Sequence, residues 1–561
     1  MAASSSSHAP GPSQIVSGAT DTRGFQLHPY QEPCVDSVLH VWKYGLPAII
    51  TAQTGSGKTY MGVAAARRWN ADYVIVVGPK ASLTKWVDVL RGEFPPENIF
   101  AITPDSWIRC GTPEAPYEHQ PYTFKVERDG KGYDFYPSPA WTELCTHYRV
   151  IFILDEFHMY QKPSQRTFAI SACSRFILLH ENQSRVLYLS HTPSDDTAYI
   201  PVHMYMMGIV CQNRDISNPS KAMVEYNQRD GKYELTGLED VMKYVEELGY
   251  DIRSVRADAN LLKYAKGRGV HSDANIIAGE LFLTYIRDKL AFSCTPSFLE
   301  NPTVKPLYEN IFCKVSKITN DKIKVLFAGG PLEEGIPIVF EHTYADADST
   351  SGLGRMMRIE QAKEKLKEMI YVEQAIEHLQ DVPTGKVVIM VQFLDSLDYI
   401  FNELKYLGYN PVKIEGCMSK SKRDASISAF QAHNLDCQVL VGTLATGGVS
   451  IDLHDTSEGG QFPRMMLIPP AMRVKDMVQA AGRVFRDGIT SKSIIRILYT
   501  ADPDTGLSYE SKFYNKIWNK TNTIKRYHAT DQNAILPCDY PTFLTEKVYN
   551  TYLDQETTSS T

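Results

Sequence analysis

The sequence has few cysteines for its length, and none of them form a closely spaced pair. Its 561 residues include 10 cysteines without a single C-x-x-C pair. Zinc ribbons and disulfide frameworks both need such clustered cysteines, so neither is expected. Sparse, unclustered cysteines are typical of a reducing compartment, and we expect an intracellular protein, cytoplasmic or nuclear.

Long apolar runs and an excess of positive charge are missing as well. No stretch reaches 18 apolar residues, the length that a membrane span requires, so no membrane partner is expected. Lys and Arg number 58 against 65 Asp and Glu, which gives a net charge of −7. A nucleic-acid partner would therefore have to bind in a local groove rather than through the overall field of the protein.

Apolar runs bounded by turns alternate with amphipathic stretches along most of the chain. This alternation predicts an α/β fold in which helices cover parallel sheets. The predicted strands are residues 48–51, 73–77, 150–154 and 186–189 in one group, and 387–392, 412–414, 438–441, 465–468 and 494–499 in another. We expect a disordered tail at 1–22, one lobe at 23–205 with a hairpin-like insertion at 111–140, an intervening α+β segment at 206–354, a second lobe at 355–505 and a C-terminal extension at 506–561.

A glycine-rich loop gives the clearest chemical signal. The segment A-Q-T-G-S-G-K-T occupies residues 52–59, between a predicted strand and a predicted helix. Glycines let successive backbone N–H groups point at phosphate oxygens, and the helix N-terminus adds its positive dipole end. Lys58 supplies a charge for the β- and γ-phosphates, and the Thr59 hydroxyl can ligate Mg²⁺. The candidate nucleotide-binding residues of the loop are Thr54, Gly55, Ser56, Gly57, Lys58 and Thr59.

An acidic pair follows the predicted strand 150–154. Asp155 and Glu156 stand at the carboxyl end of a buried parallel strand, where open α/β sheets bind their ligands. Asp155 is the candidate metal ligand, and Glu156 is the candidate for orienting or deprotonating the attacking water. A bare acidic pair after a strand would mean little, but the upstream phosphate loop makes it a catalytic candidate.

The second lobe contains the segment Q-A-A-G-R-V-F-R at residues 479–486. On a continuous helix, Gln479, Arg483 and Arg486 would fall on one face. Two guanidinium groups and an amide on one face of a helix can bind a γ-phosphate. An arginine in this role accelerates phosphoryl transfer by about 10³–10⁵-fold. We therefore predict a helical stripe of catalytic residues at this place.

These three segments, with D-E-F-H at 155–158, resemble motifs I, II and VI of the superfamily 2 DExH-type helicases and translocases. The residue sequences of these motifs are most similar to those of Swi/Snf-type ATPases and of helicases of large DNA viruses, including poxvirus-type transcription helicases. The resemblance implies two RecA-like lobes, a nucleic-acid-stimulated ATPase, and ATP and Mg²⁺ as cofactors. It also implies a DNA or RNA backbone as a sequence-independent partner, a polymerase or transcription factor as a further partner, and a virion or virus factory as an additional location.

The family order assigns roles to further segments. The resemblance implies that Gln31 hydrogen-bonds the edge of the adenine base. It also implies that His158, Ser190 and Thr192, of motifs II and III, couple nucleotide binding to movement along the nucleic acid, here called the track. Motifs Ia, IV and V imply contacts to the nucleic-acid backbone, from Pro79, Lys80, Gln392, Thr443 and Gly447. The family more often has Ala or Gly where His191 stands.

Several functions remain open at the level of sequence. The leading hypothesis is a helicase that couples ATP hydrolysis to movement along DNA or RNA, in viral transcription or replication. A duplex DNA translocase that never separates strands has the same motifs. A non-motor P-loop switch would not explain the Gln479–Arg486 segment. A restriction-type nuclease motor would need a carboxylate–lysine nuclease motif, which the sequence does not show.

Overall fold

The computed structural model describes residues 25–208 apart from 114, 116–117, 128–131 and 163, and then 224–227, 232–235 and 283–314 apart from 284. It also describes 360–444 apart from 362, 451–501 apart from 472, and 511–528. The chain divides into two compact units, residues 1–295 with 523–534, and residues 296–522 with 535–561. The expected tail at 1–22 lies outside the described residues.

The first unit is built on a six-stranded parallel sheet in the order β10-β1-β7-β6-β2-β3. Its strands are β1 (Ala48–Ile50), β2 (Tyr73–Val77), β3 (Ile99–Ile102), β6 (Val150–Asp155), β7 (Arg185–Leu189) and β10 (Ala291–Phe292). Most residues of the central strands are buried on both faces, as their continuous Val, Ile and Leu runs predict. The sequence did not predict β3 or β10, because β3 is half-buried and β10 is only two residues long.

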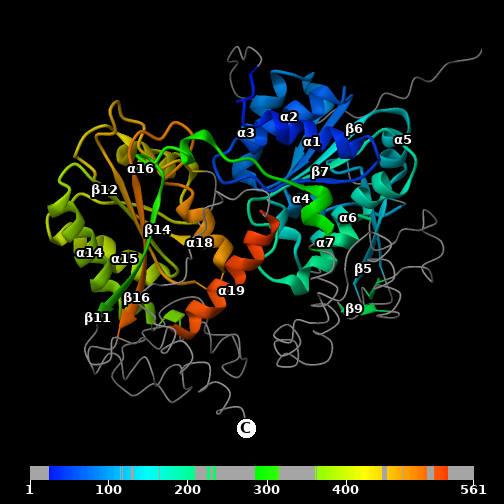
Figure 1. The fold of residues 1–561 in the computed structure, drawn as a ribbon. Helices are drawn as coiled ribbons and strands as arrows, with labels where there is room; N and C mark the ends of the chain where they lie inside the picture. Colours follow the sequence, from blue (N-terminus) through cyan, green and yellow to red (C-terminus); the bar gives the residue numbers. More distant parts are fainter. Residues whose placement is uncertain are drawn as a thin grey trace, which may run out of the picture. The chain divides into compact units, whose positions relative to one another are not determined.

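Two layers of helices cover this sheet (Figure 1). On one face, α1 (Glu32–Trp42), α2 (Lys58–Arg68) and α3 (Lys80–Arg91) share a core with the even-numbered residues of β1 and β2. On the other face lie α4 (Pro104–Trp107), α5 (Pro139–His147), α6 (Gln165–Leu179) and α7 (Ile200–Met206). Odd-numbered and even-numbered strand residues thus point to opposite faces of the sheet, and each face carries one apolar core.

The predicted hairpin insertion is present. Strands β4 (Thr123–Glu127) and β5 (Tyr133–Pro137) pair antiparallel, with Phe124 opposite Tyr136. The Thr123 hydroxyl lies 3.2 Å from the Cys173 sulfur on α6, so the hairpin packs on that helix. A second antiparallel pair joins β8 (Val224–Asn227) to β9 (Lys232–Leu235).

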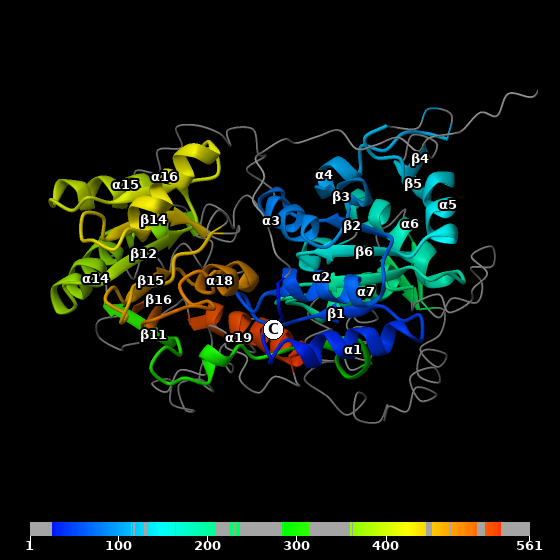
Figure 2. The same cartoon turned by 90° about the horizontal axis from the view of Figure 1, so that it is seen from above.

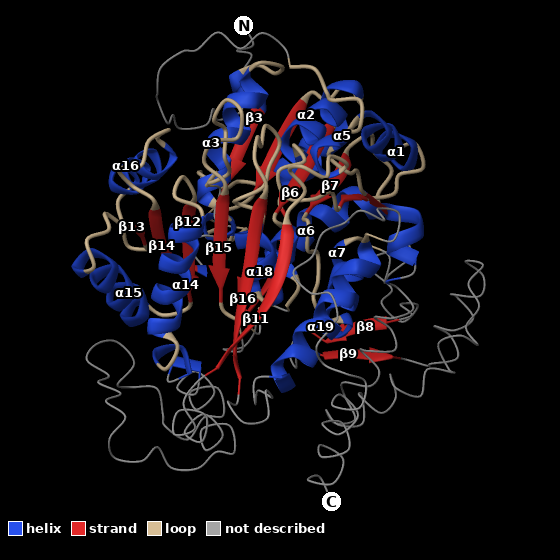
Figure 3. Ribbon diagram, turned by 60° about the vertical axis from the view of Figure 1, so that its left-hand side comes forward, coloured by secondary structure: helices blue, strands red, loops and turns tan. Residues whose placement is uncertain are grey.

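The second unit contains another six-stranded parallel sheet, in the order β11-β16-β15-β12-β14-β13 (Figure 3). Its strands are β11 (Leu307–Lys314), β12 (Lys386–Val391), β13 (Val412–Ile414), β14 (Val439–Thr443), β15 (Arg464–Ile468) and β16 (Ser493–Ala501). The prediction of two RecA-like parallel-sheet lobes is therefore confirmed. Strand β11 pairs with β16 over eight residues, whereas the sequence assigned it to an intervening segment.

Helices α14 (Glu368–Asp381) and α15 (Leu394–Tyr406) pack on one face of the second sheet (Figure 2). Helix α16 (Lys420–Gln431) precedes β14, and α18 (Val474–Ala481) precedes β16. The last described helix, α19 (Ser511–Tyr527), begins in the second unit and ends in the first. In the part of the chain that is described, no helix combines the length and the hydropathy needed to cross a bilayer.

Candidate ATP site

The phosphate loop follows β1 and leads into α2, as its sequence predicts. Gly55 and Gly57 both have positive φ angles, 82° and 81°, which side-chain-bearing residues rarely adopt. Gly57 is the N-cap of α2, and a Cβ atom there would lie 2.4 Å from Nε2 of Gln31. Glycine at this position is therefore required both by the backbone angle and by the close approach of Gln31.

Lys58 is held inside the loop that it is predicted to serve. Its ammonium group donates to the carbonyl oxygens of Ala52 and Gln53, at 2.9 and 3.0 Å. These two carbonyls keep the positive charge at the loop, where an incoming phosphate would exchange for them.

Gln31 supports the same loop from α1's N-terminal side. Its Nε2 donates to the Ser56 carbonyl at 2.7 Å, and its Oε1 accepts from the His28 N–H at 2.8 Å. The side chain is buried, so both ends of the amide hold structure in place. A contact with adenine remains a prediction for this residue, and support of the phosphate loop is the role its contacts define.

Asp155 ends β6 and lies among groups that fix its carboxylate. The indole Nε1 of Trp86 donates to its Oδ2 at 3.0 Å. Burial and the neighbouring Glu156 raise the pKa of Asp155 to about 6, against lowering contributions from Trp86, Ser82 and Lys58. Since Lys58 acts on this carboxylate, the phosphate loop and the acidic pair lie at the same edge of the sheet.

The residues present suit a magnesium ion. Carboxylate and hydroxyl oxygens, here from Asp155 and Thr59, are ligands that Mg²⁺ prefers, with water and phosphate completing its coordination. Within the described ranges, no group of three or more His, Cys, Asp or Glu side chains could hold a metal by itself. A site shared with the phosphates of a bound nucleotide fits this donor set.

Glu156 and the predicted coupling residues form one connected group. Glu156 has a left-handed backbone, with φ 53°, which is uncommon outside glycine and typical of functional turns. Its Oε2 lies 3.1 Å from Nδ1 of His158, and that nitrogen lies 3.2 Å from the Ser190 hydroxyl. The Ser190 hydroxyl in turn accepts from the N–H of Thr192 at 3.2 Å. The loop after β7 is thus connected to Glu156, the predicted catalytic residue, through the side chains of His158 and Ser190.

The predicted motif Ia residues stand at the start of α3. Pro79 is the helix N-cap, and Lys80 is the first helical residue and exposed to solvent. Trp86, two turns later in the same helix, carries the contact to Asp155. Nothing in the sequence indicates this hydrogen bond, because a buried indole is usually only a core residue.

In the second unit, the predicted helical stripe of Gln479, Arg483 and Arg486 is not formed. Helix α18 ends at Ala481, and Gly482 is its C-cap. Arg483 and Arg486 therefore lie in the segment that follows the helix. Gln479 and Arg483 are nevertheless buried.

The turn after α18 is joined to the predicted motif V. Arg486 forms an ion pair with Asp452 and donates from Nε to the Gly482 carbonyl at 3.1 Å. The backbone N–H of Leu453 donates to the Arg483 carbonyl at 2.9 Å. These contacts place the two arginines beside the segment that follows β14 within this unit.

The remaining nucleic-acid candidates lie at strand ends of the second sheet. Thr443 is the last residue of β14 and is buried, and Gln392 directly follows β12. Gly447 falls in 445–450, outside the described residues. The N–H groups of Gln392 and Phe393 donate to the Glu364 carboxylate at 2.8 and 2.9 Å, a contact that the sequence did not reveal.

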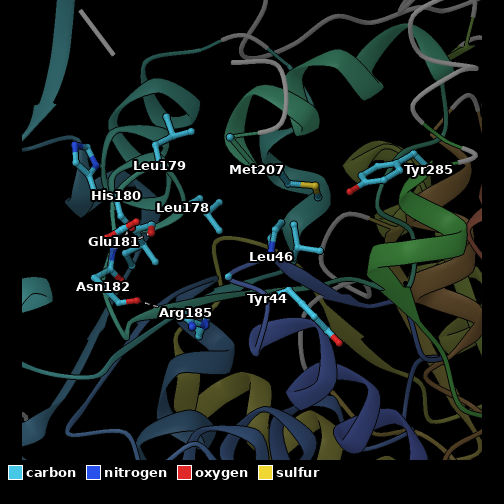
Figure 4. Close-up of a pocket in the computed structure, with 14 residues that line it drawn as sticks. Tyr44, Leu46, Leu178, Leu179, His180, Glu181, Asn182, Arg185, Met207 and Tyr285 are labelled. Carbon is cyan, nitrogen blue, oxygen red and sulfur yellow. Dashed lines mark hydrogen bonds between the residues drawn. The ribbon is translucent and has the colours of Figure 1, made fainter. Parts of the chain in front are cut away.

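A cavity of about 460 Å³ lies elsewhere in the first unit (Figure 4). Its lining includes Tyr44 and Leu46, just before β1, and Asn182 and Arg185 around the start of β7, where Arg185 Nη1 donates to the Asn182 carbonyl at 3.0 Å. This is the amino edge of the sheet. Because parallel sheets bind ligands at their carboxyl edge, the cavity is not the ATP site.

Comparison with known proteins supports these features. A model of the helicase conserved C-terminal domain matches residues 365–488. A protein of Acanthamoeba polyphaga mimivirus, named as ATP-dependent RNA helicase L364, is 24% identical over 515 residues, which cover 90% of this chain and 84% of that protein. The ATP-dependent helicase rhp16 of Schizosaccharomyces pombe is 30% identical over 152 residues, and the chain covers 16% of its length.

Two further similarities are more distant. The DNA repair and recombination protein RAD54 of Saccharomyces cerevisiae is 24% identical over 258 residues, which are 42% of this chain and 28% of that protein. The Sulfolobus solfataricus SWI2/SNF2 ATPase core in complex with dsDNA aligns over 85% of this chain and 89% of that chain, with 17% identity and a TM-score of 0.30. In the order of its motifs, its two parallel sheets and its matched helicase domain, this chain is similar to ATPases of superfamily 2, of the Swi/Snf-like and viral helicase type.

Proposed function

We propose that this ATPase is a helicase that uses ATP hydrolysis to move along a DNA or RNA backbone during viral transcription or replication. The observation that carries the proposal is the group formed by Lys58, Asp155, Glu156 and Ser190 at one edge of a parallel sheet. The likeness over nine-tenths of the chain to a mimivirus protein named as an RNA helicase supports the viral setting.

The chemistry assigned to each group follows from its contacts. Lys58 exchanges its two carbonyl partners for phosphate oxygens, and the loop N–H groups bind the same phosphates. Mg²⁺ held by Thr59 and Asp155 would neutralise charge on the phosphates. Glu156 orients the attacking water, and its contact with His158 transmits the presence of the nucleotide to Ser190.

The second unit contributes charge in this proposal. Arg483 and Arg486 act on the terminal phosphate, a role taken from the resemblance to motif VI. Asp452, which pairs with Arg486, holds that guanidinium in place until a phosphate competes for it.

In this proposal the protein binds DNA or RNA through contacts to the nucleic-acid backbone. Pro79 and Lys80 in the first unit, and Gln392, Thr443 and Gly447 in the second, are the proposed contacts. Backbone contacts bind without sequence preference and weaken as salt rises. A polymerase or transcription factor is the proposed partner, in the cytoplasm, nucleus, virus factory or virion.

A duplex DNA translocase that leaves the strands paired is the second candidate. It is favoured by the similarity to RAD54 and to rhp54 of Schizosaccharomyces pombe, both named as DNA repair proteins. The two candidates share all their motifs, so their ATP sites do not distinguish them. A non-motor P-loop switch is the alternative outside the motor class.

Two assays separate these functions. ATPase rates are measured with single-stranded and duplex DNA and RNA as stimulants, and strand displacement is compared with triplex displacement. Stimulation together with strand displacement supports the helicase. Triplex displacement without strand displacement supports the translocase, and an ATPase rate that no nucleic acid changes supports the switch.

The assignment of the ATP site has its own test. We expect Lys58→Ala and Glu156→Gln to lower nucleic-acid-stimulated ATP hydrolysis by about 100-fold or more, because each removes a group that acts on the phosphates or the attacking water. Circular dichroism should show both variants folded. Full turnover in either one would refute the assignment.

A further inference from the structure

The end of helix α19 lies against the loop that follows β7. His528, directly after the helix, is buried, and its Nε2 lies 2.6 Å from the carbonyl oxygen of His191. The two imidazole rings meet edge to face, with centroids 4.9 Å apart. Since a carbonyl oxygen only accepts hydrogen bonds, Nε2 of His528 carries the proton. Both residues belong to the first compact unit.

His191 extends this contact to the phosphate loop. Its Nδ1 lies 3.3 Å from the hydroxyl of Thr54, one residue before Gly55. Burial, His528 and Lys58 lower the pKa of His191 well below its ordinary value, so the ring is neutral. A neutral imidazole next to a lysine can lie beside the loop without repelling the charge that binds phosphate.

His528 is itself fixed from two sides. The hydroxyl of Ser293, just after β10, lies 3.5 Å from its Nδ1. The preceding residue, Tyr527, is buried in the core on the face of the sheet that α4 to α7 cover. Its hydroxyl lies 3.5 Å from Nδ1 of His203. These contacts fix the position of the imidazole of His528. Its hydrogen bond to the His191 carbonyl can therefore fix the position of the loop that contains His191.

We propose that His528 is a positioning residue that holds His191 against Thr54 and so keeps the phosphate loop in its ATP-binding conformation. The proposal rests on the function of this loop as an ATP site, and it adds a residue that lies more than 40 positions beyond motif VI. Without the link, ATP itself must order the loop, so binding weakens while the bound state is unchanged.

The test separates KM from kcat. We expect His528→Phe, which keeps a ring but loses the N–H donor, to raise the KM for ATP about three- to tenfold, the value of one lost hydrogen bond, with kcat changed less than about twofold. His528→Gln places an amide N–H near the same carbonyl and should restore the KM. His378→Phe, which removes a buried imidazole from α14, is the matched control and should leave the KM unchanged.

A merely structural role for His528 predicts a different result. Partial unfolding would lower kcat in proportion to the folded fraction and leave the KM as it was, which would overturn the proposal. An unchanged KM in His528→Phe, or a raised KM that His528→Gln does not restore, would also overturn it. If His528→Phe does not fold, Thr54→Val decides, since an unchanged KM there would exclude the link.

Failure of the proposed function looks different again. A wild-type protein that binds a fluorescent ATP analogue but hydrolyses no ATP with any nucleic acid would contradict the motor. The dissociation constant of that analogue for wild type and His528→Phe would still test the positioning role, because it measures binding alone.

Discussion

Asp155 lies between groups that move its proton affinity in opposite directions. Burial and Glu156 raise its pKa to about 6, while hydrogen bonds from Trp86 and Ser82 and the charge of Lys58 work against that rise. Trp86 stands on the helix that begins with Lys80, a proposed track contact. One helix, α3, therefore joins the proposed nucleic-acid contact at Lys80 to the carboxylate that we propose as the metal ligand.

Replacing Trp86 by Phe should expose this connection. The variant keeps an aromatic ring but loses the N–H donor, so the carboxylate of Asp155 holds its proton more tightly and competes less well for Mg²⁺. We expect the Mg²⁺ concentration for half-maximal ATPase activity to rise about three- to tenfold. Trp141→Phe loses an indole contact to the Cys173 carbonyl instead, and should not change the Mg²⁺ requirement. An equal shift in both variants would rule out a specific role for Trp86.

At the scale of elements, the segments that the sequence predicted best are the buried strands. Uninterrupted apolar runs identify β2, β6 and β12, because a strand covered on both faces needs apolar residues at nearly every position. The end of α18 was predicted wrongly, since the Gln479–Arg486 pattern fits a helix and only Gly482 argues against it. Pairing between distant segments, such as β11 with β16, leaves no local pattern at all.

The same limit applies to the site. Glycines and the lysine of the phosphate loop are local signals, and the sequence identified them. The contacts of Trp86, Glu364 and His528 join residues that lie 28 to 337 positions from their partners, so no window of sequence contains both ends. Such contacts depend on the tertiary fold.

Glu364 gives the junction of β12 and α15 a dependence on pH. Burial raises the pKa of this carboxyl to about 7, despite the hydrogen bonds from Gln392 and Phe393 that lower it. The folded protein therefore holds the proton more tightly than the unfolded chain. The stability from this group is fully present below about pH 4.5 and is lost as pH rises through 7, by up to roughly 3 kcal/mol.

Glu364→Gln removes that titration. We expect the denaturant midpoint of wild type to fall between pH 5 and pH 8 by more than that of the variant, because the glutamine amide cannot ionise. Urea unfolding at both pH values, followed by tryptophan fluorescence and circular dichroism, gives the comparison. Parallel pH dependence in the two proteins would show that Glu364 does not titrate in this range.

At the scale of the whole molecule, the net charge of −7 sets the terms of nucleic-acid binding. A protein that is acidic overall repels a polyanion at long range, so its affinity depends on a few placed cations. Lys80, exposed at the start of α3, is one of those proposed. The salt dependence of stimulation then counts the phosphates that are contacted.

Lys80→Ala should weaken this grip by one contact. We expect a higher nucleic-acid concentration for half-maximal stimulation, equally for different sequences, and a log–log salt slope smaller by about 1. ATPase activity without nucleic acid should not change. Lys43→Ala, which removes an exposed charge at the end of α1, is the control and should keep the wild-type slope.

The composition of the first unit has a consequence for how the protein matures on the ribosome. Residues 523–534 belong to this unit, and Tyr527 packs in a core whose other buried residues lie between Ile49 and Ala291. That core cannot close until nearly the whole chain has been synthesised. Premature termination between residues 296 and 522 should therefore yield a nascent first unit whose core lacks Tyr527, with apolar surface exposed to chaperones and proteases.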